Sequence, residues 1–182
     1  CASGPWLATQ LLHKADNRPE RVDPRDTVDL CRPDMIPSGW MPFLQAYDEN
    51  GDEVTLIHAD DPRLLRMAVL DVIINNADRK GGHVLAGLDG NVYGVDHGVT
   101  FSPDPKLRTI LWGWRGRPFA SDEVALLEDL GDQMAGGLGN DLRGLLSHHE
   151  VKITARRIRR LLARGTFPQP DPDRPAIPWP PF

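Results

Sequence analysis

PRLLRMAVLDVII, residues 62–74, is the stretch that decides the fold, because it predicts a helix with almost no polar face. From residue 64 onward only Arg66 and Asp71 are charged. Pro62 suits the first helical position, where the N–H that proline lacks would have no partner, and one of the two aspartates before it is placed to cap the helix. A helix that is apolar nearly all round must be buried, so this one is predicted to form the centre of the core.

A polar loop follows this helix and leads into a predicted hairpin. The loop is NNADRKGGH, residues 75–83, and a short apolar run over residues 84–86 comes directly after it. The turn GLDGN separates that run from a second one over residues 92–95, which continues into the loop DHG at residues 96–98. Because an antiparallel hairpin brings its two flanking loops to the same end, the acidic groups of both loops are predicted to meet at one edge.

The polar residues of these two loops include the kinds of group that phosphoryl transfer from ATP needs. Such transfer requires a carboxylate that orients the acceptor hydroxyl, ligands for one or two metal ions, and cations that neutralise phosphate oxygens. Asp78 is a candidate carboxylate, His83 and Asp96 are candidate metal ligands, and Gly98 completes an Asp-x-Gly pattern. The alternative for Asp78 and Asp96 is a pair of turn-forming aspartates, a common role of Asp in loops.

Two sequence segments carry a resemblance to known kinases. NADRKGGHVL, residues 76–85, and VDHGVTF, residues 95–101, resemble the catalytic and metal-binding segments of the phosphatidylinositol 3-/4-kinase-like group, and are most similar to those of type II phosphatidylinositol 4-kinases and HipA-like kinases. Residues 67–116 and the closing IPWPPF resemble more closely an actinobacterial family of uncharacterised phosphatidylinositol-kinase-like proteins. The closer resemblance covers about residues 27–182.

The resemblance implies a role for each matching residue. Asp78 would be the catalytic carboxylate, and Asp96, followed by Gly98, would bind the metal that bridges the ATP phosphates. Arg79 and Lys80 would neutralise charge on the transferring group, or form a plain solvated pair. The implied function is an ATP-dependent phosphotransferase that uses Mg or Mn and transfers the γ-phosphate to a hydroxyl of a lipid, a protein or a small metabolite.

His83 departs from this kinase pattern. It stands five residues after Asp78, where those kinases place an Asn that binds the second metal. Magnesium prefers oxygen ligands, whereas imidazole better suits manganese, iron or zinc. His83 is therefore a metal ligand that changes the metal preference, a group that acts through a water, a sign of a weakened kinase, or a histidine that only hydrogen-bonds the loop backbone.

Two rival functions stay open on these residues. The first is a catalytically decayed descendant that serves as a nucleotide-binding or protein-interaction module. The second is a metal-dependent hydrolase in which Asp78, His83, Asp96 and His97 hold a metal-activated water in place of the acceptor.

The chain also lacks the upstream motifs of an ATP cleft. Neither G-x-G-x-x-G nor a V-A-I-K-like strand precedes Asp78. We therefore predict an α+β, protein-kinase-like C-terminal lobe, mostly helical, with β-hairpins that bear the active-site loops and with the N-terminal lobe largely missing. Residues 1–40 are predicted to be a remnant of that lobe or its hinge plus a linker, residues 41–167 the C-terminal lobe, and residues 168–182 a Pro-rich tail packed on the body.

Local patterns predict the remaining elements. Residues 43–47 and 54–58 suit two strands of a hairpin, and a helix is predicted from a Ser121 cap to about residue 134, with a break over residues 135–139. A final helix is bounded by a capping box at Ser147 and by Gly165. Its predicted core positions are Val151, Ala155, Ile158 and Leu162.

Two further segments each have two interpretations. The final helix is strongly basic, which suits either a solvated face or contact with anionic lipid or phosphate. The segment LWGWRGR, residues 111–117, suits either an acceptor pocket or a set of buried aromatic anchors.

Composition limits the class of protein. The 182 residues include 21 basic and 26 acidic side chains, a net charge of −5, with 40% hydrophobic residues. These values are typical of a globular domain, and the acidic balance argues against nucleic acid as a partner. No run of roughly 18 apolar residues suggests a membrane span, and no signal peptide is evident, so a cytoplasmic location is expected.

Overall fold

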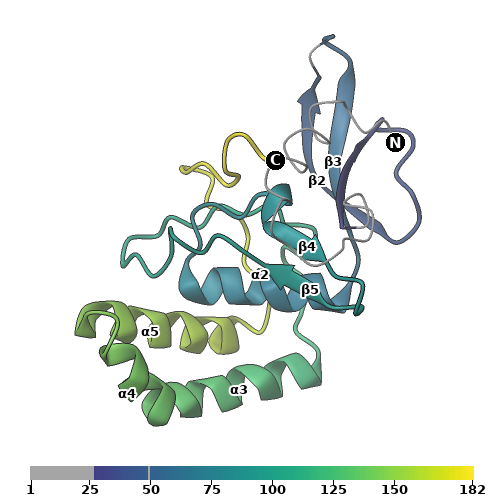
Figure 1. The fold of residues 1–182 in the computed structure, drawn as a ribbon. Helices are drawn as coiled ribbons and strands as arrows, with labels where there is room; N and C mark the ends of the chain where they lie inside the picture. Colours follow the sequence, from purple (N-terminus) through teal and green to yellow (C-terminus); the bar gives the residue numbers. More distant parts are fainter. Residues whose placement is uncertain (1–26, 49) are drawn as a thin grey trace.

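The computed structural model describes residues 27–48 and 50–182. These residues form a mixed α+β fold with two small antiparallel sheets and four α-helices (Figure 1). The elements are β1 (Val28–Cys31), β2 (Trp40–Tyr47), β3 (Glu53–Ala59), α2 (Pro62–Ile74), the 3-10 turn η2 (Gly81–His83), β4 (Val84–Ala86), β5 (Val92–Gly94), α3 (Ser121–Ala135), α4 (Gly137–Arg143) and α5 (His148–Arg164). Residues 1–26, part of the segment predicted to be a lobe remnant or hinge plus a linker, lie outside the described residues.

The larger sheet has the strand order β1-β3-β2. The predicted hairpin is confirmed as β2 and β3, which pair antiparallel from Trp40 opposite Ala59 to Tyr47 opposite Glu53. β1 was not expected, because it lies in the segment that the sequence predicts to be a linker. A four-residue strand has little pattern of its own, and this one is defined by its antiparallel pairing with β3.

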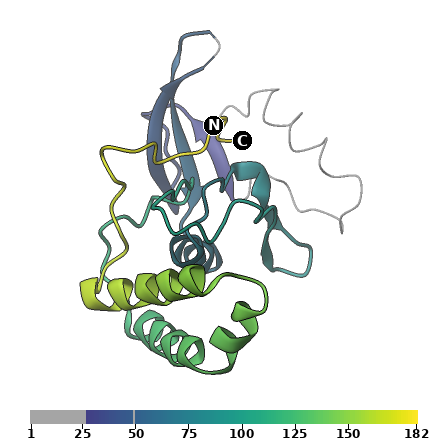
Figure 2. The same cartoon turned by 90° about the vertical axis from the view of Figure 1, so that its left-hand side faces the viewer.

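Helix α2 lies at the centre of the fold, as its sequence predicts. The side chain of Asp61 caps it by accepting a hydrogen bond from the backbone N–H of Arg63 at 2.7 Å, and Pro62 begins it. Its end is set by Asn75, which adopts the left-handed conformation with φ of 55°. Figures 1 and 2 show α2 between the three-stranded sheet and the layer formed by α3, α4 and α5.

The helices after residue 120 differ from the prediction in two places. Ser121 is the first helical residue of α3 rather than its cap, which is Ala120, and the Glu123 side chain accepts a hydrogen bond from the Ala120 N–H at 2.8 Å. The predicted break shrinks to Gly136, because residues 137–143 form the short helix α4. Glycines have low helix propensity, but here they allow close packing: a Cβ on Gly139 would lie 2.0 Å from the Met134 carbonyl oxygen.

Helix α5 is bounded as predicted. Ser147 and Glu150 form the capping box, and Gly165 ends the helix in the left-handed conformation. Its buried side chains are Val151, Thr154, Ile158 and Leu161. The buried stripe is thus turned slightly from the predicted one, and Ala155 and Leu162 are only half-buried.

The segment after α5 returns along the body (Figure 2). The Ala176 carbonyl accepts hydrogen bonds from the Thr109 N–H and the Trp112 indole, and the Pro181 carbonyl accepts one from the Gly81 N–H at 2.9 Å. Phe182 is buried against Gly81, where a Cβ would lie 2.3 Å from its ring. Trp179 of the same tail is 84% exposed.

The tryptophans of residues 111–117 are buried anchors, the second of their two interpretations. His58 on β3 is fully buried and packs against Trp114, with ring centres 4.4 Å apart and the ring planes tilted by 37°. Its Nε2 accepts a hydrogen bond from the Gly113 N–H, and its Nδ1 donates to the Ala59 carbonyl, both at 2.9 Å. This neutral imidazole therefore fastens the segment to the sheet.

We expect the fold to lose stability in acid through His58. Burial lowers the pKa of His58 from 6.5 to about 4, so the unfolded chain takes up a proton at a higher pH than the folded one does. The contribution is fully present above pH 6.5 and falls by on the order of 3 kcal/mol as the pH drops to 4. Urea unfolding at pH 7 and pH 5 measures it: His58→Asn should flatten this pH dependence, whereas His148→Gln, at an exposed position, should leave it unchanged.

In the part of the chain that the structure describes, no helix is long and apolar enough to cross a membrane.

Candidate functional site

A buried ion pair lies beneath the loops that carry the candidate site. Asp71 of α2 and Arg79 are both fully buried, and the Arg79 Nη2 lies 2.9 Å from the Asp71 Oδ1. The Arg79 Nε donates to both carboxylate oxygens, at 3.2 and 3.1 Å. Asp71 accepts two further hydrogen bonds, from the Asn76 amide at 2.9 Å and the Thr109 hydroxyl at 3.1 Å. This carboxylate joins α2 to two separate loops.

Arg79 also holds the two acidic loops together. Its Nη1 donates to the His83 carbonyl at 3.2 Å and to the Val95 carbonyl at 3.1 Å. The Val95 N–H in turn donates to the His83 carbonyl at 3.0 Å. Gly94 makes this close approach possible, because a Cβ there would lie 3.2 Å from the Arg79 Nη2. The two loops are therefore joined directly at the base of the site.

The hydrogen bonds of Arg79 account for all five of its N–H groups. The last partner is His97, whose Nε2 lies 2.8 Å from the Arg79 Nη2. Since a guanidinium only donates, that ring nitrogen must be an acceptor. Burial and then the charge of Arg79 lower the pKa of His97, which agrees with a neutral ring. Arg79 therefore positions backbone and side chains, and it has no N–H left for a phosphoryl group.

Two asparagines fix the loop between α2 and Asp78. Asn75 donates to the carbonyls of Ser102 and Asp104, and its side-chain oxygen accepts from the Lys106 N–H. Asn76 accepts a hydrogen bond from the Asp78 N–H at 3.0 Å. Asp78 thus follows a loop whose polar groups are satisfied by its surroundings.

The loop that contains Asp96 is attached to the end of α2 by backbone hydrogen bonds. The Ala77 N–H donates to the Val99 carbonyl at 2.9 Å, and the Phe101 N–H donates to the Ile74 carbonyl at 2.6 Å. Asp96 adopts a left-handed conformation with φ of 57°, which Asp tolerates better than most residues do. Gly98 is exposed, and a Cβ there would make only an ordinary contact with Asp96, at 3.8 Å.

His83 connects the two candidate carboxylate residues. It is 1% exposed, and its Nδ1 lies 2.8 Å from the Asp78 carbonyl oxygen. Because a carbonyl only accepts, Nδ1 must carry the proton of this hydrogen bond. The other ring nitrogen, Nε2, lies 3.4 Å from the Asp96 Oδ2. The backbone-bonding interpretation and the metal-ligand interpretation of His83 are thus compatible, because each uses a different nitrogen.

The His83 and Asp96 pair fits a shared divalent cation. Two ligands that each bind one ion at about 2.1 Å lie roughly 3.0 to 3.4 Å apart, which is the separation of these two atoms. Within residues 27–48 and 50–182, no group of three or more His, Cys, Asp and Glu side chains is placed to hold a metal ion. These two donors alone would leave most coordination positions of an ion unfilled.

Asp78 and Lys80 lie on the outer side of the loop. The Asp78 side chain is about one-third exposed, and the Lys80 ammonium lies 3.5 Å from its Oδ1. Both charged groups are therefore partly accessible from solvent. Of the residues predicted at the site, these two and Asp96 face solvent, whereas Arg79 and His83 are buried beneath them.

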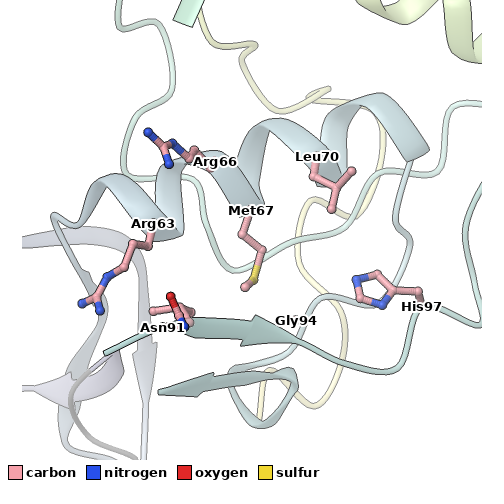
Figure 3. Close-up of a pocket in the computed structure, with 8 residues that line it drawn as sticks. Arg63, Arg66, Met67, Leu70, Asn91, Gly94 and His97 are labelled. Carbon is pink, nitrogen blue, oxygen red and sulfur yellow. The ribbon is translucent and has the colours of Figure 1, made fainter. Parts of the chain in front are cut away.

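A separate cavity of about 360 Å³ lies between α2 and β5 (Figure 3). Met67 and Leu70 point into it from the helix, and His97 faces it from the end of the hairpin. None of Asp78, Lys80 and Asp96 lines it. The cavity adjoins the candidate site through Gly94 and His97, which belong to both.

Four residues of the site were missed by sequence reasoning: Asp71, Asn76, Gly94 and Thr109. Asp71 had a usable signal, because a lone acid in an otherwise apolar helix needs a buried partner, and the next arginine after it is Arg79. Thr109 had none, since its partner lies 38 residues away.

This α+β chain is similar in sequence to an actinobacterial protein. It is 50% identical over 157 residues to Protein Rv2133c of Mycobacterium tuberculosis. The match covers 86% of this chain and 56% of the relative, so the chain spans little more than half of that protein's length. No family model matches the sequence, and no solved structure matches it. The name of that relative states no activity.

Proposed function

We propose that this chain forms the C-terminal, protein-kinase-like lobe of an ATP-dependent phosphotransferase that transfers the γ-phosphoryl group to a hydroxyl acceptor. One observation carries the proposal. The buried Arg79 joins the Asp78 loop to the Asp96 loop, and His83 contacts both aspartates through its two ring nitrogens. A carboxylate and a candidate metal-binding pair on joined loops support this proposal.

Asp78 is the proposed catalytic carboxylate. The acceptor hydroxyl oxygen would attack the γ-phosphorus, the bond from that phosphorus to the bridging oxygen of ADP would break, and Asp78 would take the hydroxyl proton. The ammonium of Lys80, 3.5 Å from Asp78, is placed to neutralise negative charge on the transferring group.

Arg79 takes a different role from the one the resemblance implies. Its guanidinium is fully buried and fully bonded, so we assign it as a positioning residue rather than a phosphate contact. Lys80 alone of the two basic residues after Asp78 is exposed enough to meet a phosphoryl group.

His83 and Asp96 are the residues that would hold the metal ion. When bound, a divalent cation would neutralise phosphate oxygens of ATP. One imidazole and one carboxylate form a mixed donor set, which favours manganese more than an all-oxygen set would.

The proposal includes a location and an acceptor class. We propose a cytoplasmic location, because ATP is the donor. The acceptor is a hydroxyl compound, and assays with a lipid, a protein and small polyols as separate substrates distinguish the three classes.

Thermal unfolding of the full-length protein with ATP and either Mg²⁺ or Mn²⁺ tests the proposal. At nucleotide concentrations 100-fold above Kd, binding should raise Tm by about 5–10 °C. If no pair of nucleotide and metal raises Tm, the phosphotransferase assignment fails.

We expect His83→Asn to move the metal preference from Mn²⁺ towards Mg²⁺, because an amide oxygen replaces an imidazole nitrogen beside Asp96. The ratio of ATP-dependent Tm shifts in the two metals measures this. An exposed-site change of the same type, His148→Asn, is the control. An identical metal ratio in His83→Asn and the unaltered protein would show that His83 is not a ligand.

A second candidate function follows from the buried position of His83. A nucleotide-binding module without catalysis would retain the Arg79 network and tolerate His83 in place of the kinase Asn. Such a protein would show the Tm shift but transfer no phosphate. Release of phosphate at equal rates with and without an acceptor would instead indicate a metal-dependent hydrolase.

A further inference from the structure

The outward face of α5 carries positive charge only. Its exposed basic side chains are Lys152, Arg156, Arg159, Arg160 and Arg164. The one acidic residue of the helix, Glu150, is used in the capping box with Ser147. Within the described residues, none of the five basic side chains forms an ion pair with an Asp or a Glu.

The spacing of these charges works against the helix itself. Lys152, Arg156, Arg160 and Arg164 follow one another at intervals of four residues, where side chains are neighbours and like charges repel. Burial and the nearby charge of Arg160 also lower the pKa of Arg157 to about 10. An anionic surface laid against this face would relieve the repulsion along its whole length.

A large apolar side chain lies at the N-terminal end of the same helix. Leu145 precedes the Ser147 cap by two residues and is 83% exposed. Basic groups attract lipid phosphates, and an exposed apolar side chain can enter the acyl boundary, so the two features together suit a membrane interface. A nucleic-acid backbone would use the charges but not the leucine.

We propose that the basic face of α5, together with Leu145, docks this protein on an anionic membrane surface. The neighbouring helix α3 exposes the acidic residues Glu128, Asp129 and Asp132 and has no basic residue, so of these two helices only α5 carries exposed positive charge. Docking through α5 is independent of the phosphotransferase proposal, because it involves neither Asp78 nor Asp96.

Vesicle co-sedimentation of the full-length protein tests the docking surface. Binding is expected on phosphatidylcholine vesicles with about 30% phosphatidylserine and not on phosphatidylcholine alone. The double variant Arg156→Gln/Arg160→Gln should weaken binding by roughly 25-fold, since each basic group near such a surface contributes about fivefold. Leu145→Ser should weaken it further in a way that salt does not change.

Arg32→Gln/Arg66→Gln is the matched control, because it removes the same charge from exposed positions outside α5. It should bind vesicles within about threefold of the unaltered protein. Equal binding by the α5 variant and this control would overturn the proposal. So would binding to single-stranded RNA that is unaffected by Leu145→Ser and tighter than binding to the vesicles.

Discussion

Asp78→Asn in the full-length protein should lower the rate of phosphoryl transfer by about 10²- to 10⁴-fold, the range over which a positioned general base contributes to catalysis. An amide has nearly the shape of the carboxylate but cannot take the proton of the acceptor hydroxyl. The Asp78 carboxylate is about one-third exposed and its ion pair with Lys80 is long at 3.5 Å. Folding stability should therefore change by less than about 1 kcal/mol.

The measurement is kcat with radiolabelled ATP, together with the ATP-dependent Tm shift of each variant. The shift should survive in Asp78→Asn, because the proposed metal ligands His83 and Asp96 are untouched. Asp34→Asn, at an exposed position in the β1–β2 connection, is the control for the change of charge. Transfer at the normal rate by Asp78→Asn would remove Asp78 from the mechanism.

The parts of the fold that could be predicted are those with local signals. Helix α2 is marked by its continuous apolar run, and α5 by a capping box and a glycine that becomes left-handed at its end. The β2–β3 hairpin has a strong turn between its strands. β1 and α4 have no such local signal: the first is stabilised by pairing with β3, and the second begins at a glycine.

The same distinction applies to the site. The positions of Asp78, His83 and Asp96 at one edge follow from the hairpin between them, so a sequence pattern can predict that they meet. What each side chain does depends on contacts with distant residues. The sequence predicts Arg79 to be an exposed cation in a polar loop. It is buried instead, because Asp71 in the core helix α2 supplies a compensating charge.

Asp71→Ala should destabilise the fold by about 3–5 kcal/mol, because it leaves the Arg79 guanidinium buried without its counter-charge. The substitution also removes the acceptor of the Asn76 and Thr109 hydrogen bonds. Since a domain of this size has a total stability of about 5–15 kcal/mol, the variant is expected to be partly unfolded at 37 °C. Urea unfolding measures the loss.

A milder variant and a compensated one keep this prediction testable if Asp71→Ala does not fold. Thr109→Val should cost about 1–3 kcal/mol, because it removes one hydrogen bond to Asp71 and leaves the Leu111 N–H without its acceptor. Asp71→Leu/Arg79→Met replaces the buried pair by apolar groups, which often restores much of the stability.

The compensated variant also separates the two roles of Arg79. With methionine at this position, no guanidinium joins the carbonyls of His83 and Val95, so the Asp78 and Asp96 loops lose their common support. We therefore expect a folded protein with a kcat at least about 100-fold lower, since small displacements of positioned groups have effects of this size. Full activity in that folded variant would mean that Arg79 stabilises the core without positioning the site.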